Sequence, residues 1–185
     1  SHLGNFEICH ALSEGRDGMK LTVLHHSQHT AKFNEVLRRY SRDSQVELMS
    51  VGDLSIGSAI RLSEKIAKGE FIAVAADRTP INNPTAVQSI DFLGVPAAFP
   101  TGPFSMALAL QCPILALHCI KLNGRYHIHF ESLSEGEPSN RKQRDAILAK
   151  LIEKHVQRLE HFCKQAPWQW FNFYPFWPSD EMDNQ

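Results

Sequence analysis

Phe71-Ile72-Ala73-Val74-Ala75-Ala76 is a run of apolar residues that is followed at once by Asp77-Arg78. A continuous apolar run of this length, without alternation, is typical of a strand that is buried on both faces of a parallel sheet. Gly69, two residues earlier, is suited to end a preceding helix. The charged pair after the run then falls at the carboxyl end of the strand, where α/β sheets gather their ligands. This stretch therefore predicts both the fold class and one side of a functional site.

The segments before this run alternate between strand and helix patterns. Residues 21–24 and 46–51 are β-prone, whereas residues 28–40 and about 56–68 carry apolar side chains at helical spacing. Strand, helix, strand, helix, strand is the order expected for a parallel sheet covered by helices on both faces. We therefore expect an α/β fold, a three-layer α/β/α sandwich with a mostly parallel sheet.

The second half of the chain continues with strands and two helices. The expected strands are residues 87–92, 95–99, 112–118 and 126–130. Asn123-Gly124 is a strong hairpin signal, because both residues tolerate the left-handed backbone of a tight turn. Thr101-Gly102-Pro103 is expected to open a helix that runs to about residue 111, with Pro103 in its first turn. The longest helix is expected over about residues 139–164, and the side that packs on the sheet is expected to be Leu148, Leu151, Ile152, His155, Leu159 and Phe162.

The N-terminal stretch His2-Leu3-Gly4-Asn5-Phe6-Glu7 places an imidazole and a carboxylate five residues apart. An imidazole that removes a proton from an alcohol needs a neighbouring group to hold its tautomer and stabilise its cation, and Glu7 can be that group. Asn5 suits the N-cap of a short helix over residues 6–13, which places Glu7 near the positive end of the helix dipole. By itself, the pattern also describes a helix-capping turn with a surface histidine.

Several motifs together resemble those of the bacterial lipid A late acyltransferases, in the lysophospholipid acyltransferase superfamily. In chain order they are His2-Leu3-Gly4-Asn5-Phe6-Glu7, Ala75-Ala76-Asp77-Arg78, Phe99-Pro100-Thr101-Gly102-Pro103 and the aromatic ending Pro167-Trp168-Gln169-Trp170-Phe171. The resemblance runs from His2 to about Trp177 and implies a glycerolipid acyltransferase-like fold. We expect residues 1–185 to be a single acyltransferase domain and the C-terminal part of a longer chain, without the N-terminal anchor or fused domain of relatives.

The resemblance implies an acyltransferase in which His2 is the general base and Glu7 orients it. The acceptor hydroxyl would attack the thioester of a fatty acyl chain carried by acyl carrier protein or coenzyme A. The acceptor would be a membrane (glyco)lipid such as a lipid A precursor, at the cytoplasmic face of the bacterial inner membrane. The ending from Gln169 to Trp177 lacks the basic residues usual in the lipid A branch. Another glycolipid, an ornithine-type lipid or a pigment lipid therefore fits equally well.

A second group of residues is assigned to substrate binding: Asn5, Arg39, Asp77, Arg78, Thr101 and Gly102. Arg78 can grip a phosphate or carboxylate with its planar fork, or it forms a loop ion pair. Arg39 falls where family members place a substrate-contacting arginine, although a solvated helix end is equally consistent. The backbone N–H groups of Thr101-Gly102 can bind an anion or a developing oxyanion, or they merely begin a helix. Thr101 replaces the glutamate of glycerolipid acyltransferases, which argues against glycerol 3-phosphate as the acceptor.

The composition excludes several other classes of protein. A net charge of −1, without any basic run, argues against a nucleic-acid surface. No apolar segment approaches the roughly 18 residues needed to span a bilayer, and no signal peptide is visible. The four cysteines form no C-x-x-C pair, which indicates reduced thiols. The histidine groups at residues 25–29 and 127–129 lack a completing carboxylate or cysteine, so we expect no metal site and no cofactor.

Two rival functions stay open at this stage. His2 and Glu7 could activate water in a thioester hydrolase, or the chain could be a non-catalytic lipid-binding domain. The aromatic ending is expected either at a membrane–water interface or, slightly favoured, in packing at the apolar edge of the sheet. Because acyl carrier protein is acidic, the basic face of the last helix, with Lys150 and Lys154, is a candidate surface for docking it.

Overall fold

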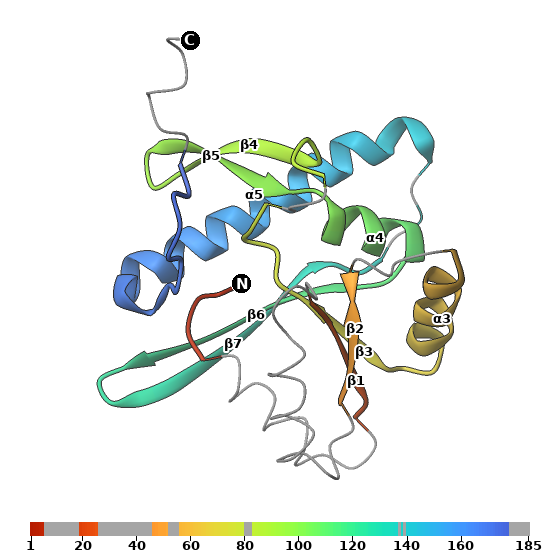
Figure 1. The fold of residues 1–185 in the computed structure, drawn as a ribbon, viewed down its shortest axis with the longest axis horizontal. Coiled ribbons are helices and arrows are strands. Elements are labelled where there is room, and N and C mark those ends of the chain that lie inside the picture. Colours follow the sequence, from red (N-terminus) through yellow and green to blue (C-terminus); the bar gives the residue numbers. More distant parts are fainter. Residues whose placement is uncertain are drawn as a thin grey trace. The chain divides into compact units, whose positions relative to one another are not determined.

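The computed structural model describes residues 1–5, 19–25, 46–51, 56–79, 83–136, 138 and 140–177. The chain divides into two compact units, one of residues 1–6 with 76–185 and one of residues 7–75 (Figure 1). The helices expected over residues 6–13 and 28–40 lie outside the described residues. A single acyltransferase domain over residues 1–185 stays a prediction, since compact units need not be separate domains.

The smaller unit contains a three-stranded parallel sheet. Strand β1 (Leu21–His25) lies between β2 (Val46–Ser50) and β3 (Phe71–Val74), and both pairings are parallel. Helix α3 (Ile56–Ala67) contacts β3 and buries Leu62 almost completely. The apolar run that begins at Phe71 therefore forms a parallel strand as predicted, although the strand ends two residues before Ala76.

The larger unit consists of two hairpins, two helices and a final 3-10 turn. Its elements are β4 (Val87–Phe92), β5 (Val95–Pro100), α4 (Gly102–Leu110), β6 (Ile114–Leu122), β7 (Arg125–Ser134), α5 (Arg141–Gln165) and η3 (Pro167–Gln169). The two turns are Leu93-Gly94 and Asn123-Gly124, and all four of these residues have positive φ. Two adjacent residues in this conformation match the twist of the flanking strands and close a tight hairpin.

The predicted three-layer α/β/α sandwich with a mostly parallel sheet is wrong. Among the described strands, only β1, β2 and β3 are parallel, whereas β4–β5 and β6–β7 are separate antiparallel pairs. The physical reason is the length of the connections. A two-residue turn can join only antiparallel neighbours, while parallel neighbours need a crossover of about a dozen residues or more. Residues 112–118 were expected to form a buried strand followed by a hairpin at Asn123-Gly124, and that hairpin pairs β6 with β7.

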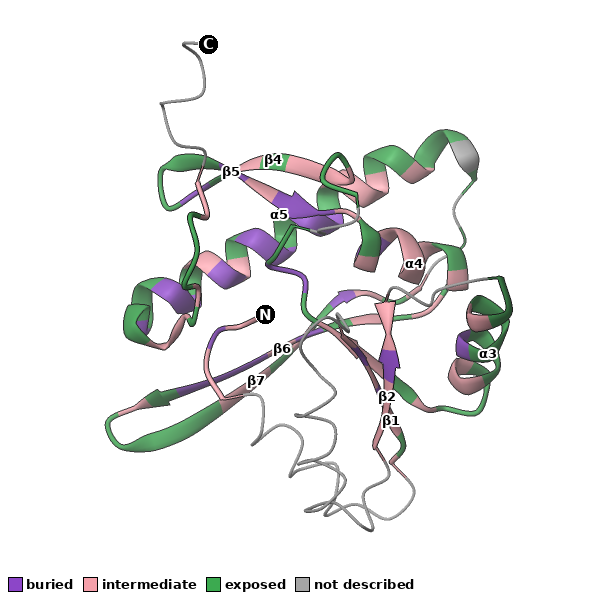
Figure 2. Cartoon of the chain, viewed as in Figure 1, coloured by how far each residue is buried: buried purple, intermediate pink, exposed green. Residues whose placement is uncertain are grey.

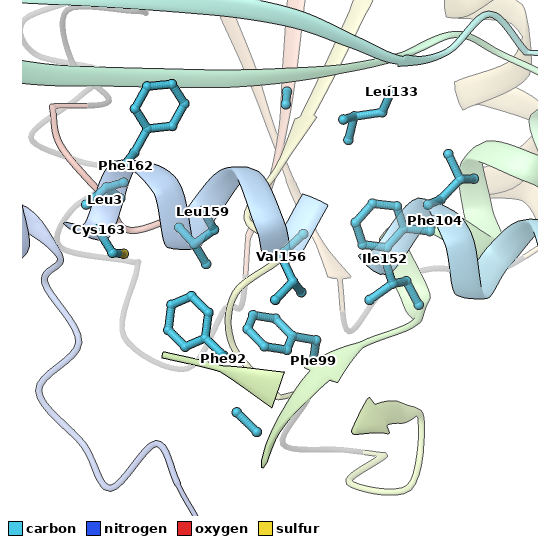
Figure 3. Packing of buried hydrophobic residues seen from close by; sticks show 14 of the residues in the cluster. Leu3, Phe92, Phe99, Phe104, Leu133, Ile152, Val156, Leu159, Phe162 and Cys163 are labelled. Atoms are coloured by element: carbon cyan, nitrogen blue, oxygen red, sulfur yellow. The ribbon is translucent and has the colours of Figure 1, made fainter. Parts of the chain in front are cut away.

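Helix α5 is the centre of the larger unit's core. Its N-cap Asn140 accepts a hydrogen bond from the Gln143 backbone N–H at 3.0 Å. The buried residues recur every three or four positions along one side: Leu151, Ile152, His155, Val156, Leu159, Phe162 and Cys163. Figure 2 shows this purple stripe, and it confirms the expected apolar face of the helix. In Figure 3, Phe162 lies on the side of the β6–β7 hairpin, and Phe92 and Phe99 lie on the opposite side.

The C-terminal segment closes one edge of this core. Phe92 is fully buried, and its ring centroid lies 5.2 Å from that of Trp170 and 5.7 Å from that of Phe176. The ring of Trp177 stacks on that of Phe92, with the two centroids 6.2 Å apart. Burying a ring of this size contributes about 1.5–3 kcal/mol to stability. Packing is therefore the correct interpretation for these residues of the aromatic ending.

Two histidines belong to the same core. His118 of β6 is 3% exposed and His155 of α5 is 6% exposed, and their rings are nearly parallel with centroids 6.5 Å apart. The Nε2 atoms of both have no hydrogen-bond partner among the described residues. Burial disfavours the imidazolium form, and it lowers the pKa of His118 to about 3 and that of His155 to about 4. Both side chains are neutral at pH 7.

We expect the free energy of unfolding to fall as the pH is lowered from 6.5 towards 4. The unfolded imidazoles take up protons near pH 6.5, whereas the folded pKa values lie at about 3 for His118 and about 4 for His155. Unfolding therefore binds protons throughout this window, at a cost of up to about 1.4 kcal/mol per pH unit for each histidine. Urea unfolding of His118→Gln between pH 7 and 5 should show a slope smaller by about 1 kcal/mol per unit.

His127→Gln is the matched control, because His127 is an exposed imidazole on the hairpin that contains His118. The change of slope in His118→Gln should exceed that in His127→Gln. An unchanged slope in His118→Gln would show that this imidazole titrates normally in the folded protein.

Candidate functional site

His2 and Asp77 lie 75 residues apart in the sequence and are joined by two contacts. The His2 backbone N–H donates to Asp77 Oδ2 at 2.6 Å, and the ring atom Nδ1 lies 2.9 Å from Oδ1. The indole N–H of Trp170 also donates to Oδ2, at 3.3 Å. The Asp77 side chain is only 1% exposed, whereas that of His2 is 34% exposed. The carboxylate is thus enclosed, while the imidazole is partly open to solvent.

A short extended segment holds His2 in this position. Leu3 forms a bridge to Trp170, and Gly4 forms one to Cys119 of β6. Leu3 is also part of the core cluster, with 4% of its surface exposed. The backbone bonds that complete the attachment run from Gly4 N to Gln169 O (2.8 Å), from Asn5 N to Cys119 O (2.8 Å) and from Phe171 N to His2 O (3.0 Å). The N-terminal residues are therefore fixed from both sides by segments that are distant in sequence.

The electrostatics of the pair determine which nitrogen of His2 carries a proton. Burial alone would raise the pKa of Asp77, but the hydrogen bonds and the charge of His2 more than offset it and hold that pKa well below its usual range. An ionised carboxylate can only accept hydrogen bonds, so Nδ1 of His2 carries the hydrogen. In the neutral ring, Nε2 then has the free lone pair. The imidazole is held in the tautomer that a general base requires.

His155 supports the site from inside the core. Burial lowers the pKa of this imidazole, and the backbone of Ala76, the residue before Asp77, partly offsets that effect. The ring packs against Phe104 of α4, with centroids 5.4 Å apart. The His155 ring thus lies near both α4 and the backbone of the segment that carries Asp77. The sequence predicted the burial of His155 but not its position beside this segment.

Arg78 is exposed and faces the same C-terminal segment. One of its terminal nitrogens donates to Phe171 O at 3.0 Å, and its guanidinium carbon lies 5.7 Å from the ring centre of Tyr174. Within the described part of the chain, Arg78 forms no ion pair with a carboxylate. The alternative of a loop ion pair is thus not observed there. A guanidinium has five N–H donors, and only one is used in this contact.

The other predicted residues lie apart from the His2–Asp77 pair or outside the described chain. Besides its backbone bond to Cys119, Asn5 approaches the Tyr126 hydroxyl at 3.5 Å through its amide nitrogen. The Thr101 hydroxyl donates to Ala86 O at 3.1 Å and does not cap α4, whose first residue is Gly102. Both Glu7 and Arg39 lie outside the described residues, and so does the predicted contact between His2 and Glu7.

Sequence reasoning missed two features of this site. Asp77 was assigned to substrate contact, whereas its carboxylate oxygens are occupied by His2 and Trp170. Trp170 belongs to the aromatic ending, for which packing of the rings was predicted but a hydrogen bond from the indole N–H to Asp77 was not. Among the described residues, no group of three metal-ligating side chains is present.

Comparison with known proteins adds the family. The family model described as bacterial lipid A biosynthesis acyltransferase matches residues 1–179, almost the whole chain. This match confirms the resemblance that the motifs indicated. A comparison with curated proteins gives no match. No helix in the described part of the chain is long and apolar enough to cross a membrane.

We expect Gly4→Ala to displace His2 and to destabilise the protein. Gly4 has φ of +79°, and a Cβ atom there would lie 1.9 Å from the Cys119 carbonyl oxygen. Gly94→Ala is the matched control, because Gly94 also has positive φ (+88°) but has open space around it. The control should cost roughly 1–2 kcal/mol in unfolding free energy, and Gly4→Ala about 1–3 kcal/mol more. Equal costs in chemical denaturation would contradict the close approach of Gly4 to β6.

Proposed function

Because the chain belongs to the bacterial lipid A biosynthesis acyltransferase family, we propose that it transfers a fatty acyl chain from a thioester donor to a hydroxyl group of a membrane (glyco)lipid. The observation that supports this most directly is the His2–Asp77 pair. An enclosed, ionised carboxylate holds the Nδ1–H of a partly exposed imidazole, which leaves Nε2 available as a base. The family gives the reaction class, and the pair supplies a residue for its proton transfer.

In the proposed reaction, Nε2 of His2 takes the proton from the acceptor hydroxyl. The acceptor oxygen attacks the thioester carbonyl, and a tetrahedral intermediate forms. When the C–S bond breaks, the imidazolium returns its proton to the departing thiolate, so the histidine is regenerated. The Asp77 carboxylate stabilises the imidazolium between these steps. General-base catalysis of this kind typically contributes about 10²- to 10⁴-fold to the rate, and holding the two substrates together accounts for much of the rest.

Arg78 is proposed to bind an anionic group of the acceptor. Its guanidinium is fixed near the site by the Phe171 carbonyl and the Tyr174 ring, and most of its donors point to no described partner. Bidentate binding of phosphate or carboxylate is the chemistry that this geometry favours. The lipid A precursor is the acceptor suggested by the family, and other anionic glycolipids satisfy the same chemistry. Thr101 and Gly102 are proposed to bind the developing oxyanion. Glu7, Asn5 and Arg39 are proposed to have the roles that the resemblance implies.

Acyl carrier protein or coenzyme A is the proposed donor. Lys150 and Lys154 lie along an open groove of about 410 Å³ between β7 and α5. Lys154 donates to the Ser132 carbonyl oxygen at 2.7 Å, which leaves Lys150 as the less restrained cation of the two. An acidic carrier protein complements such a surface, although Glu135 lines the same groove. The proposed place of reaction is the cytoplasmic face of the inner membrane.

The test is acyl transfer from labelled acyl carrier protein to a bacterial lipid extract, with the parent compared with His2→Ala. We expect a labelled lipid with the parent and a loss of at least about 10²-fold in the variant. The mass of the product identifies the acceptor. His127→Ala, which removes an exposed imidazole elsewhere, should leave the rate unchanged.

Two results would overturn this proposal. Label that appears only as free fatty acid would indicate a thioester hydrolase, a reaction that the partial exposure of His2 also permits. No turnover of any donor, with lipid binding intact, would indicate a binding domain.

Asp77→Asn tests the role of the carboxylate at nearly constant shape. The amide cannot stabilise an imidazolium, so we expect kcat to fall by about 10²- to 10⁴-fold while KM changes little. Asp91→Asn, at an exposed position of β4, is the control. Circular dichroism should confirm that Asp77→Asn is folded. A kcat within threefold of the parent's would indicate that Glu7, and not Asp77, orients His2.

A further inference from the structure

The C-terminal segment presents a group of aromatic rings to solvent beside the candidate site. Trp170, Phe176 and Trp177 pack into the core, but their neighbours do not. The exposed fractions are 93% for Trp168, 46% for Phe171, 88% for Phe173 and 36% for Tyr174. We call these four residues the aromatic rim. Figure 2 shows this part of the chain mainly in the exposed colour.

The aromatic rim is attached directly to His2. The Phe171 backbone N–H donates to the His2 carbonyl at 3.0 Å, and the Phe171 carbonyl accepts from Arg78. The rings of Phe171 and Phe173 lie 6.2 Å apart, and Tyr174 lies below the Arg78 guanidinium. Large exposed apolar groups that adjoin each other and rim a site mark an interaction surface more often than single exposed side chains do.

Positive charge accompanies these rings. Arg78 lies at Tyr174, whereas the ammonium group of Lys121 lies over the ring of Tyr126 in β7, 5.4 Å from its centre. Asp77 is enclosed and already partnered. Aromatic rings together with Lys and Arg are the residues that membrane interfaces favour, and anionic headgroups attract the cations. Acidic residues at positions 180, 181 and 183 follow in the sequence, so we expect the rings to contribute more than the charge.

We propose that the aromatic rim docks on an anionic lipid bilayer and brings His2 to the acceptor lipid. This inference rests on the proposed function, because a lipid acceptor resides in a bilayer and its hydroxyl has to reach His2 there. A second copy of the chain fits the surface less well. Two copies would bring two Arg78 guanidinium groups to one interface without adding an anion, whereas an anionic bilayer supplies anions.

The test is co-sedimentation of the chain with vesicles of phosphatidylcholine containing 30% phosphatidylglycerol, for the parent and for the double variant Phe171→Ser/Phe173→Ser. We expect the variant to bind at least about tenfold more weakly, since it lacks two rings that move from water into the bilayer interface when the parent binds. Phe130→Ser is the matched control, because Phe130 is 61% exposed but belongs to β7. It should bind as the parent does. Phe171→Ser/Phe173→Trp should regain part of the lost affinity.

Trp168 provides a second measurement. Its fluorescence should be quenched by brominated lipids in the parent, and Trp168→Phe should remove most of that quenching, because Trp170 and Trp177 pack against the core. Circular dichroism verifies that each variant is folded.

The outcomes separate this proposal from the proposed function. Vesicle binding needs no donor, so His2→Ala should bind as the parent does even though transfer is lost. Binding of the double variant at the parent's level, or no binding by the parent, overturns the docking surface and leaves the acyl-transfer assay unaffected. A dimer in analytical ultracentrifugation that only the double variant loses would assign the aromatic rim to a second copy instead.

Discussion

The enclosed carboxylate of Asp77 is the constraint on which the site depends. An ionised carboxylate with 1% of its surface exposed is costly unless hydrogen bonds replace the lost water. The backbone and ring of His2 and the indole of Trp170 supply three such contacts. These donors come from the beginning and the end of the chain, so satisfying one buried charge fixes three distant segments together. Removing any donor would leave part of the charge unpaired, which explains why a site made from such segments is held in one geometry.

The core gives this arrangement its rigidity. Helix α5 is enclosed by the two hairpins, and His155 on its buried face packs against Phe104 of α4. Leu3 inserts into the same core next to His2. The residues that flank both members of the pair are therefore packed, and neither His2 nor Asp77 depends on loop conformation alone. Positioning of this kind is what a general base needs, because misplacement by about 1 Å can cost 10²-fold in rate.

Local patterns in the sequence predicted most elements, because periodicity and turn residues act over short distances. The turn at Leu93-Gly94, the hairpin at Asn123-Gly124 and the long helix all formed close to the expected positions. The assembly of the strands into one mostly parallel sheet was mispredicted, since an apolar run does not specify its partner, and connection length determines it instead. The contact of His2 with Asp77 joins residues 75 positions apart. The motifs named both residues, but no local signal indicated that the carboxylate would be used by the imidazole.

The partial exposure of His2 bears on how acyl transfer could prevail over hydrolysis. An imidazole that is 34% exposed can activate water as readily as an alcohol. A lipid surface against the aromatic rim, whose backbone bonds to His2, would exclude water from the ring and present lipid hydroxyls in its place. Exclusion of water would also strengthen the attraction between Asp77 and the imidazolium of the proposed reaction, because the local dielectric falls. In the proposed function, the enclosed carboxylate and the exposed rings would then serve the same step: the carboxylate orients His2, and the rings bring it to the lipid surface that holds the acceptor.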